Sequence, residues 1–467
     1  MKTLYQKFLQ TTLAITGFLL ILTVRCHTED LSGWDLAEKF FQNMTPPVFP
    51  HRQFDITDFG AVGDGLQDCS EALRQAIEKC HGSGGGSVWV PAGNYLTGPI
   101  HLKSNVNLIL AKEATLLFSI RTEDYLPVVY TRFEGVECMN YSPLIYAFEA
   151  ENIAVTGAGL LDGQASLEHW WPWAGKPEYG SSADWPTQFE DRQQLFQMAE
   201  SGLPVEERIF GAGHYLRPNF IQFYRCKNIL VQDISIINSP MWEVHPVLCE
   251  NVIVRNIHVK THGPNNDGCN PESCTNVLIQ NCFFDTGDDC IAIKSGRNGD
   301  GRRVNVPSQN ILVRDCTMKD GHGGVVIGSE MSGGVRNVFV ENCLMDSPNL
   351  ERALRIKTNS LRGGTVENVY MRKVTIGEVS DAVLRINFNY EEGDTGPHTP
   401  AVRKVFLSEV TSRKSRFALA LDGYERSPIS QVHIQSCRFD GVLENSLYNH
   451  IQDLKLDQVY VNGELQP

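Results

Sequence analysis

Short apolar runs recur along most of the chain, and within each run apolar and polar residues alternate with a period of two. After Asn276 the chain reads VLIQNCFF, after Asn310 ILVRDCTM and after Asn337 VFVENCLM. Such alternation is typical of β-strands. The same pattern follows other positions that align in one column, with weaker copies at the last three and an earlier copy at the first: Asn152, Asn228, Asn251, Asn368, Lys404, Gln431 and Asp453.

From Asn228 onward, consecutive column positions are 22 to 36 residues apart, and few helical patterns lie between them. Repeats of this length that are built from strands and turns indicate a solenoid. A leucine-rich repeat would need a regular leucine lattice, which is absent, and a propeller would need about 40–50 residues per blade. We therefore predict an all-β fold, a right-handed parallel β-helix.

The cysteines follow the same register. Cys282, Cys316, Cys343 and Cys437 all lie six residues after a column position, whereas Cys226, Cys249 and Cys274 lie two residues before one. Unpaired cysteine behaves as a small buried apolar residue. A zinc cluster would need paired C-x-x-C spacing, which is absent here, so we interpret the cysteines as ladders inside the solenoid.

The chain divides into three parts. Residues 1–26 carry two lysines and then an apolar run, a pattern that predicts a secretory signal peptide. Residues 27–53 are interpreted as an N-terminal extension, and residues 54–467 as a single β-helix domain. An amphipathic helix at residues 69–80 is expected to cap the open N-terminal end of the solenoid, which would otherwise expose strand edges.

One long insertion, residues 163–218, interrupts the repeat and holds four of the seven tryptophans. Insertions of this length project from a solenoid and often carry function. The tryptophans could stack on a sugar ring or could simply pack the loop onto the scaffold.

Four polar clusters between residues 263 and 357 are predicted to lie at the ends of successive apolar runs. If the apolar runs stack, these clusters meet in space, and they bring together three carboxylates, an imidazole and two cations: Asp267, Asp288, Asp289, His322, Arg355 and Lys357. Crowded carboxylates should raise at least one pKa and keep one acid protonated. Asp267 and Asp288 lie on neighbouring rungs, so we expect their carboxyl groups to lie about 6.5–9.5 Å apart, which leaves room for a water molecule.

The charge is unevenly distributed. The whole chain has a net charge of −14, whereas residues 294–362 contain 11 basic and 7 acidic residues. A locally positive groove on an acidic protein suits a polyanionic substrate. Nucleic acid is disfavoured because no basic stripe with interleaved aromatic residues accompanies the charge.

Four segments carry a family resemblance: N-N-D-G at 265–268, G-D-D-C at 287–290, G-H-G-G at 321–324 and R-I-K at 355–357. In order and spacing they resemble the signature segments of the polygalacturonases, family 28 of the glycoside hydrolases, over residues 54–460. One departure is Asn266, where the family usually has threonine. The resemblance implies hydrolysis, with inversion, of the α-1,4 linkages between galacturonate units of pectin, an acidic polysaccharide, without a metal or organic cofactor.

By the same resemblance, Asp288 is the general acid, Asp267 and Asp289 hold and activate water, and His322 adjusts the protonation of the acids. Arg355 and Lys357 lie two residues apart on a strand, so both side chains leave the same face and can bind a substrate carboxylate. Asn265 and Tyr390 are expected to contact the substrate.

Several alternatives stay open at this point. The three acids could bind calcium, the enzyme could hydrolyse rhamnogalacturonan, or the protein could be a non-catalytic β-helix that binds pectin. The insertion could close one side of the groove, which predicts exo action, whereas an open groove would permit endo cleavage.

We expect export to the periplasm or the medium, with no transmembrane segment in the mature chain. A lipid anchor at Cys26 is conceivable, although Arg25 fits such processing poorly. The sequence makes no prediction of the oligomeric state.

Overall fold

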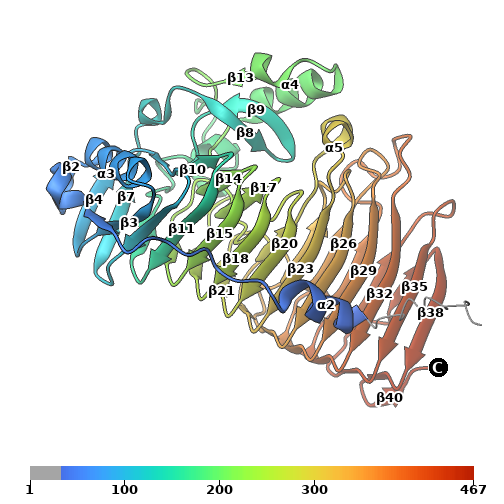
Figure 1. The fold of residues 1–467 in the computed structure, drawn as a ribbon. Helices are drawn as coiled ribbons and strands as arrows, with labels where there is room; N and C mark the ends of the chain where they lie inside the picture. The colour runs from blue at the N-terminus through green and yellow to red at the C-terminus, as the bar shows by residue number, and fades with distance from the viewer. Residues whose placement is uncertain (1–32) are drawn as a thin grey trace, which may run out of the picture.

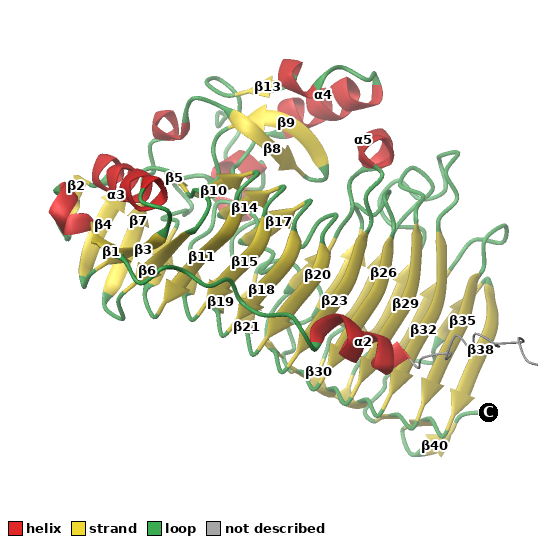
Figure 2. Ribbon diagram, in the orientation of Figure 1, coloured by secondary structure: helices red, strands yellow, loops and turns green. Residues whose placement is uncertain are grey.

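The computed structural model describes residues 33–467. The expected signal peptide at residues 1–26 lies outside this described part. The described chain winds into a right-handed parallel β-helix with three long faces, which confirms the predicted fold class (Figures 1 and 2). Within residues 33–467, no helix is both long and apolar enough to cross a membrane.

The first sheet has thirteen strands within the described residues, and all its pairings are parallel. Its strands, in spatial order, are β1 (Gln53–Asp55), β3 (Gly86–Val90), β6 (Val106–Leu110), β11 (Glu151–Gly157), β15 (Lys227–Gln232), β18 (Glu250–Arg255), β20 (Thr275–Gln280), β23 (Ser308–Arg314), β26 (Val335–Glu341), β29 (Thr365–Arg372), β32 (Ala401–Ser408), β35 (Ile429–Gln435) and β38 (Ile451–Asp457).

The second sheet has fourteen strands in the described part, and only its final pair is antiparallel. It contains β2 (Asp64–Asp68), β4 (Gly93–Thr97), β7 (Ala114–Phe118), β12 (Leu160–Asp162), β16 (Ser235–Ile237), β19 (His258–Thr261), β21 (Phe283–Thr286), β24 (Thr317–Met318), β27 (Leu344–Met345), β30 (Thr375–Glu378), β33 (Thr411–Lys414), β36 (Arg438–Phe439), β39 (Tyr460–Val461) and β40 (Glu464–Leu465).

The third sheet carries the polar clusters. It consists of a group of strands near the N-terminal end and a second group further along, which residues 269–272 bridge through isolated pairings. The strands are β5 (Ile100–His101), β10 (Ile145–Phe148), β14 (Ile221–Tyr224) and β17 (Val244–Val247), followed by β22 (Ile291–Ile293), β25 (Val325–Gly328), β28 (Arg352–Lys357), β31 (Ala382–Asn387), β34 (Phe417–Asp422) and β37 (Leu447–Asn449).

The column residues of the sequence repeat all adopt a left-handed backbone conformation; Asn310, for example, has φ 57°. Asparagine tolerates this region better than most residues, which explains its recurrence. The side chains also form a ladder: Asn310 Nδ2 donates to Asn276 Oδ1 (3.0 Å), and Asn337 Nδ2 donates to Asn310 Oδ1 (2.9 Å). The ladder fixes the register between rungs.

Each apolar run is longer than one strand. The run that begins at Asn276 forms β20 and then β21, with a turn at Asn281, whose φ is 53°. The two halves therefore belong to the first and the second sheet.

The twelve cysteines among the described residues are all buried and free, as the ladder interpretation requires.

Two helices cover the solenoid in different places. Helix α3 (Ser70–Gly82) lies at the N-terminal end of the solenoid, where Leu73 and Ile77 are buried (Figure 1). Helix α2 (Gly33–Phe41) packs far from there, on the outer face of β20 to β29. Its Trp34 contacts Phe339 and Tyr370, so the N-terminal segment runs along the outside of the solenoid back to β1.

Two excursions rise above the third sheet. One is the hairpin of β8 (Val129–Phe133) and β9 (Val136–Asn140). The other is the insertion, which contains α4 (Phe189–Glu200) and β13 (Ile209–Phe210), and β13 pairs with β9. The remaining short elements of the described chain are the helix α5 (Asn298–Val304) and the 3-10 turns η1 (Ile56–Phe59), η2 (Thr122–Tyr125), η3 (Trp171–Ala174), η4 (Pro177–Tyr179) and η5 (Val205–Glu207).

The tryptophans of the insertion mostly pack the loop onto the scaffold. Trp170 and Trp173 are 3% and 8% exposed and belong to the main core. Trp171 Nε1 donates to the carbonyl oxygen of Ser239 at 2.8 Å. Among the four tryptophans of the insertion, only Trp185 is exposed (40%) and does not pack the loop onto the scaffold.

Candidate active site

The structure brings the polar clusters together at the start of successive rungs of the third sheet. Asp288 and Asp289 precede β22 by three and two residues, and His322 precedes β25 by three residues. Arg355 and Lys357 lie within β28, next to β25. The clusters therefore do not end the apolar runs of the first two sheets; each follows its run after the turn into the third sheet.

The three acids form one group. Asp267 reaches it because Cys269, two residues later, pairs with Ile291 of β22. One oxygen of each of Asp267, Asp288 and Asp289 lies within 4.8 Å of the others. These nearest oxygens are closer than the separation of about 6.5–9.5 Å expected between inverting carboxyl groups, so this distance does not by itself indicate the stereochemistry.

Each acid has its own cation. Lys357 Nζ lies 2.9 Å from Asp289 Oδ2, and His322 Nδ1 lies 2.9 Å from Asp288 Oδ1. Lys294 Nζ lies 3.8 Å from Asp267 Oδ2 and 3.1 Å from Glu330 Oε2. Three different local charges therefore act on three neighbouring carboxyl groups.

These partners separate the protonation states. Burial and the charge of Asp288 raise the pKa of Asp267 well above its usual range. Burial opposes ionisation of Asp288, yet the hydrogen bond and the charge of His322 hold the pKa of Asp288 below its usual range. The same hydrogen bond and charge raise the pKa of His322 to about 9. The raised pKa of Asp267 favours its neutral form, whereas Asp288 and His322 form an ion pair.

The third acid, Asp289, has different surroundings. Asp289 is 0% exposed, and its Oδ2 accepts a hydrogen bond from Lys357. Its Oδ1 is buried and has no hydrogen-bond partner among the described residues. A buried carboxylate oxygen without a partner is costly, and a substrate hydroxyl or a water molecule would satisfy it.

Asn266, which departs from the family pattern, forms hydrogen bonds with the backbone around the loop that carries Asp267. Its Nδ2 donates to the carbonyl oxygens of Ser239 (3.1 Å) and Met241 (3.0 Å), and its Oδ1 accepts from the Gly263 amide (2.7 Å). The turn before Asp267 is therefore held by Asn266.

Arg355 and Lys357 face the same side of β28. Both cations lie over the ring of Tyr390, at 5.4 Å and 5.2 Å from its centroid. Lys357 is engaged by Asp289, whereas Arg355 Nη1 is 3.9 Å from Asp289 Oδ1. Arg355 is thus the more available of the two for a substrate carboxylate.

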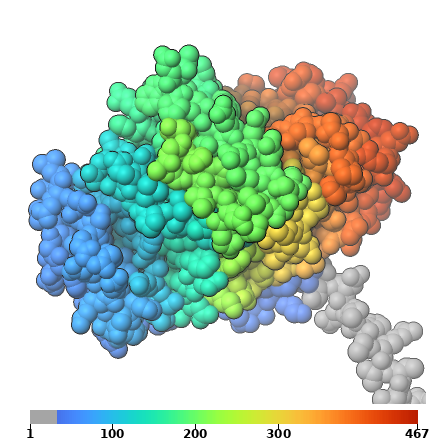
Figure 3. All heavy atoms as spheres, turned by 90° about the horizontal axis from the view of Figure 1, so that it is seen from above, coloured from blue at the N-terminus to red at the C-terminus, as the bar shows by residue number. Residues whose placement is uncertain are grey.

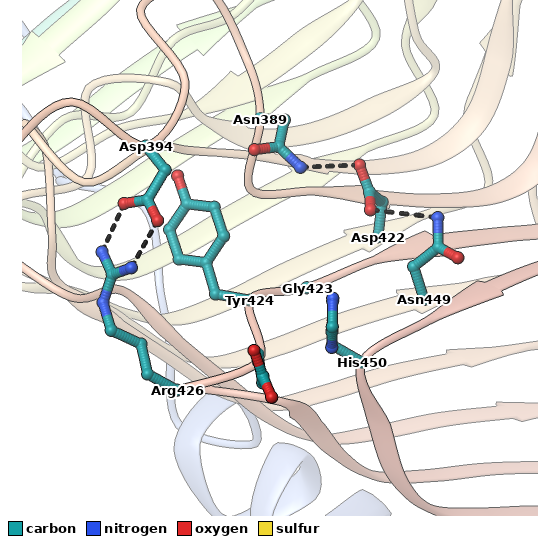
Figure 4. A pocket seen from close by; sticks show the side chains of 9 residues that line it. Asn389, Asp394, Asp422, Gly423, Tyr424, Arg426, Asn449 and His450 are labelled. Carbon is teal, nitrogen blue, oxygen red and sulfur yellow. Dashed lines mark hydrogen bonds and ion pairs between the residues drawn. The ribbon is translucent and has the colours of Figure 1, made fainter.

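The loop that carries Tyr390 is fixed from its other side. Asn389 Nδ2 donates to Asp422 Oδ2 (2.9 Å), and Asn449 Nδ2 donates to Asp422 Oδ1 (3.3 Å). These residues line a separate cavity of about 480 Å³ (Figure 4). The loop between the two cavities is therefore anchored on the third sheet.

The acids line a pocket of about 250 Å³ together with His322, Lys357, Asn265 and Tyr390. Its far wall comes from the two excursions: Glu134 lies in the turn of the β8–β9 hairpin, and Lys176 and Arg192 lie in the insertion. Arg192 Nη2 lies 2.7 Å from Glu134 Oε2, so an ion pair ties the hairpin to the insertion. Seen from above, green atoms of this region cover the middle of the face (Figure 3).

Several residues that line the pocket were not predicted from the sequence. Lys294 could have been found, because β22 and its continuation align with β25 and β28 and place Lys294 in the same column as Lys357. The others lie outside the repeat pattern, Arg192 in α4 and the rest in loops: Glu134, Lys176, Arg192, Trp242, Arg297, Ser329, Glu330 and Glu391.

A calcium site would use the same three acids, Asp267, Asp288 and Asp289. Calcium prefers several carboxylate and carbonyl oxygens without competing cations. Here Lys294, His322 and Lys357 each lie beside one of the acids. Their positive charge would repel a divalent ion, so this arrangement suits acid–base chemistry better than calcium binding.

The chain resembles known proteins over most of its length. Residues 212–454 match the model of glycosyl hydrolases family 28, and residues 53–112 match that of rhamnogalacturonase A/epimerase, pectate lyase-like. A "Probable polygalacturonase" of Vitis vinifera is 29% identical over 403 residues, which cover 82% of this chain and 73% of the relative. An "Exo-poly-alpha-D-galacturonosidase" of Dickeya chrysanthemi is 25% identical over 425 residues, which cover 84% of this chain and 68% of the relative.

Among solved structures, a hyperthermoactive exopolygalacturonase from Thermotoga maritima superimposes with a TM-score of 0.90 at 49% identity. The match covers 92% of this chain and 96% of that chain. The family model spans more than half of this chain, including all three acids and both cations of β28. The chain therefore belongs to family 28 of the glycosyl hydrolases.

Proposed function

We propose that this protein is an exo-acting polygalacturonase, which hydrolyses the α-1,4 linkage next to a terminal galacturonate of pectin. The observation that carries the proposal is the pocket of three acids whose far wall is made by the hairpin and the insertion. A polymer could lie across an open groove, whereas a walled pocket admits a chain end. The names of the Thermotoga maritima and Dickeya chrysanthemi relatives support the same mode of action.

In the proposed mechanism, Asp288 delivers a proton to the leaving oxygen while water attacks the anomeric carbon and the glycosidic bond breaks. The Asp288–His322 pair, which shares a hydrogen bond of 2.9 Å, carries this proton. The proton lost by water passes to Asp289, whose free Oδ1 is available to accept it. Asp267, whose raised pKa favours the neutral form, would hold the water by a hydrogen bond.

This assignment refines the sequence-based one. The general acid predicted from the resemblance, Asp288, is ionised at rest, so its proton must come from His322. Inversion is proposed from the family resemblance, and the anomeric configuration of the first product, followed by proton NMR, tests it.

Substrate specificity is proposed to lie in β28 and the loop after β31. Arg355 would bind the carboxylate of the sugar next to the cleaved bond, and the Tyr390 ring would pack against that sugar. A guanidinium can bind a carboxylate through two parallel hydrogen bonds. This cation disfavours the alternative of a rhamnogalacturonan hydrolase, and the partner we propose is galacturonan.

The proposal includes a single catalytic domain at residues 54–467 and export directed by residues 1–26. A pectin-binding protein without activity would not need an unpartnered buried carboxylate oxygen beside two other acids.

The test follows viscosity and products together. Purified protein is incubated with polygalacturonate, with Asp288→Asn as the inactive control. We expect galacturonate monomer to accumulate while most of the viscosity remains, and a loss of about 10²–10⁴-fold in kcat for the control. An early collapse in viscosity with mixed oligomers would establish endo cleavage instead. Full activity in a folded Asp288→Asn variant would overturn the catalytic assignment.

A further inference from the structure

Arg217 is fully buried beneath the rim of the acid pocket and holds three separate segments together. Its Nη1 donates to the carbonyl oxygens of Pro240 (2.9 Å) and Pro264 (2.7 Å), and its Nη2 donates to Asn265 Oδ1 (2.6 Å). Its Nε donates to Gln188 Oε1 (3.1 Å), one residue before α4. One side chain thus joins the insertion to the loop that carries Asp267.

All four partners are neutral. Within residues 33–467, no carboxylate lies within ion-pair distance of Arg217. Burial lowers the pKa of Arg217 to about 10, so the side chain is still a cation at neutral pH. A buried cation without an anionic partner costs free energy, and apolar residues are often more stable at such positions. This cost suggests a role beyond the stability of the fold.

The contact with Asn265 settles the orientation of an amide in the pocket. A guanidinium has only donors, so the Asn265 atom facing it must be the oxygen. The NH₂ group then points away from Arg217 and has no hydrogen-bond partner among the described residues. Because Asn265 lines the acid pocket, this free donor is offered to whatever occupies the pocket.

We propose that Arg217 is a positioning residue, which orients Asn265 so that its Nδ2 donates to an oxygen of the terminal galacturonate. Through Pro264 it also fixes the turn before Asp267, and through Gln188 it couples the closing insertion to the acids. This inference rests on the proposed function, since it adds a positioning residue behind the substrate contact expected of Asn265.

Two substitutions at Asn265 test whether its Nδ2 donates a hydrogen bond to the substrate. Asn265→Asp keeps an oxygen for Arg217 but removes the donor, so we expect a KM at least tenfold higher with no loss of Tm. Asn265→Gly removes the side chain, and glycine tolerates the backbone conformation there (φ 54°). We expect a similar rise in KM and a smaller change in kcat.

Arg217→Lys retains the charge but cannot hold all four acceptors, so we expect it to raise KM several-fold. In the Asn265→Gly background the same change should raise KM no further, because coupled residues are not additive. The matched control is Arg208→Lys: Arg208 is also buried, but it pairs with Asp300 (2.8 Å) outside the acid pocket, so the change should lower Tm and leave KM unchanged.

The outcomes are decisive. If Asn265→Asp retains the wild-type KM, or if the Arg217→Lys and Asn265→Gly effects on KM simply multiply, the positioning role is wrong. The wild-type protein is assayed first for release of galacturonate from oligogalacturonides. A wild type that releases none refutes the proposed function, whereas an active wild type with unaffected variants refutes only the role of Arg217.

Discussion

At the scale of single residues, the site consists of three carboxyl groups that the surrounding cations make unequal. Lys294, His322 and Lys357 each lie beside a different acid. Sequence adjacency alone would make Asp288 and Asp289 similar, but one faces an exposed imidazole and the other a buried lysine. Pairs of acids whose environments separate their pKa values can take different catalytic roles.

The His322–Asp288 pair predicts a specific pH dependence. The folded-state pKa of His322, about 9, is above its unfolded value of about 6.5, so the pair's stabilisation is complete below about pH 6.5 and is lost as the pH rises to about 9. The lowered pKa of Asp288 removes the stabilisation in acid, below about pH 4. We expect the Tm difference between wild type and His322→Gln to be greatest near pH 5–6. A difference that grows toward pH 10 would contradict this ion pair.

The two cations of β28 should behave differently when truncated. Arg355→Ala removes a substrate contact and should mainly raise KM, by tenfold or more. Lys357→Ala also removes the ion pair of Asp289, which is buried, so we expect kcat to fall as well as KM to rise. Steady-state kinetics on oligogalacturonides distinguishes the two effects. Equal losses of kcat in both variants would show that Arg355 acts on the transition state.

At the scale of elements, each rung depends on a backbone turn that most residues disfavour. The asparagine ladder supplies both the left-handed conformation and a hydrogen bond to each neighbouring rung. This explains why the column positions where asparagine is absent belong to the weaker copies near the C-terminus. A second left-handed residue further along the run, such as Asn281, divides each apolar run between two sheets.

Asn310 offers a test of both contributions. Asn310→Ala loses two ladder hydrogen bonds and leaves a residue that tolerates the left-handed conformation less well than asparagine, so we expect a destabilisation of about 2–3 kcal/mol. Asn310→Gly loses the same hydrogen bonds without the backbone strain and should be less destabilised. Thermal unfolding compares the two variants. If glycine is as harmful as alanine, the backbone conformation contributes little.

At the scale of the whole molecule, two faces of the solenoid differ in what they carry. The first sheet is covered on its outside by the N-terminal segment, whose helix α2 packs on Leu278, Leu312 and Phe339. The third sheet carries the acids beneath the hairpin and the insertion. Helix α2 and the two excursions that wall the acid pocket therefore lie on different sides of one scaffold (Figure 2).

This separation predicts the effect of Trp34→Ala. Trp34 packs against Phe339 and Tyr370, and Arg372 lies over its ring at 3.7 Å. Its removal should destabilise the protein by about 2 kcal/mol and lower Tm by several degrees. KM and kcat below Tm should stay unchanged, because α2 lies on a different sheet from the acids. A changed KM would show coupling between the two faces.

The sequence alone determined the rungs, the cysteine ladders and the main acids and cations, because each depends on a pattern that repeats within a few tens of residues. Only the tertiary structure decided which sheet carries the site, which cation acts on which acid, and how the pocket is walled. Glu134 meets Arg192 and Arg297, and Arg217 meets Asn265, across 48 to 163 residues of chain. These contacts join loops without periodicity, and no local pattern encodes where such loops fold relative to one another.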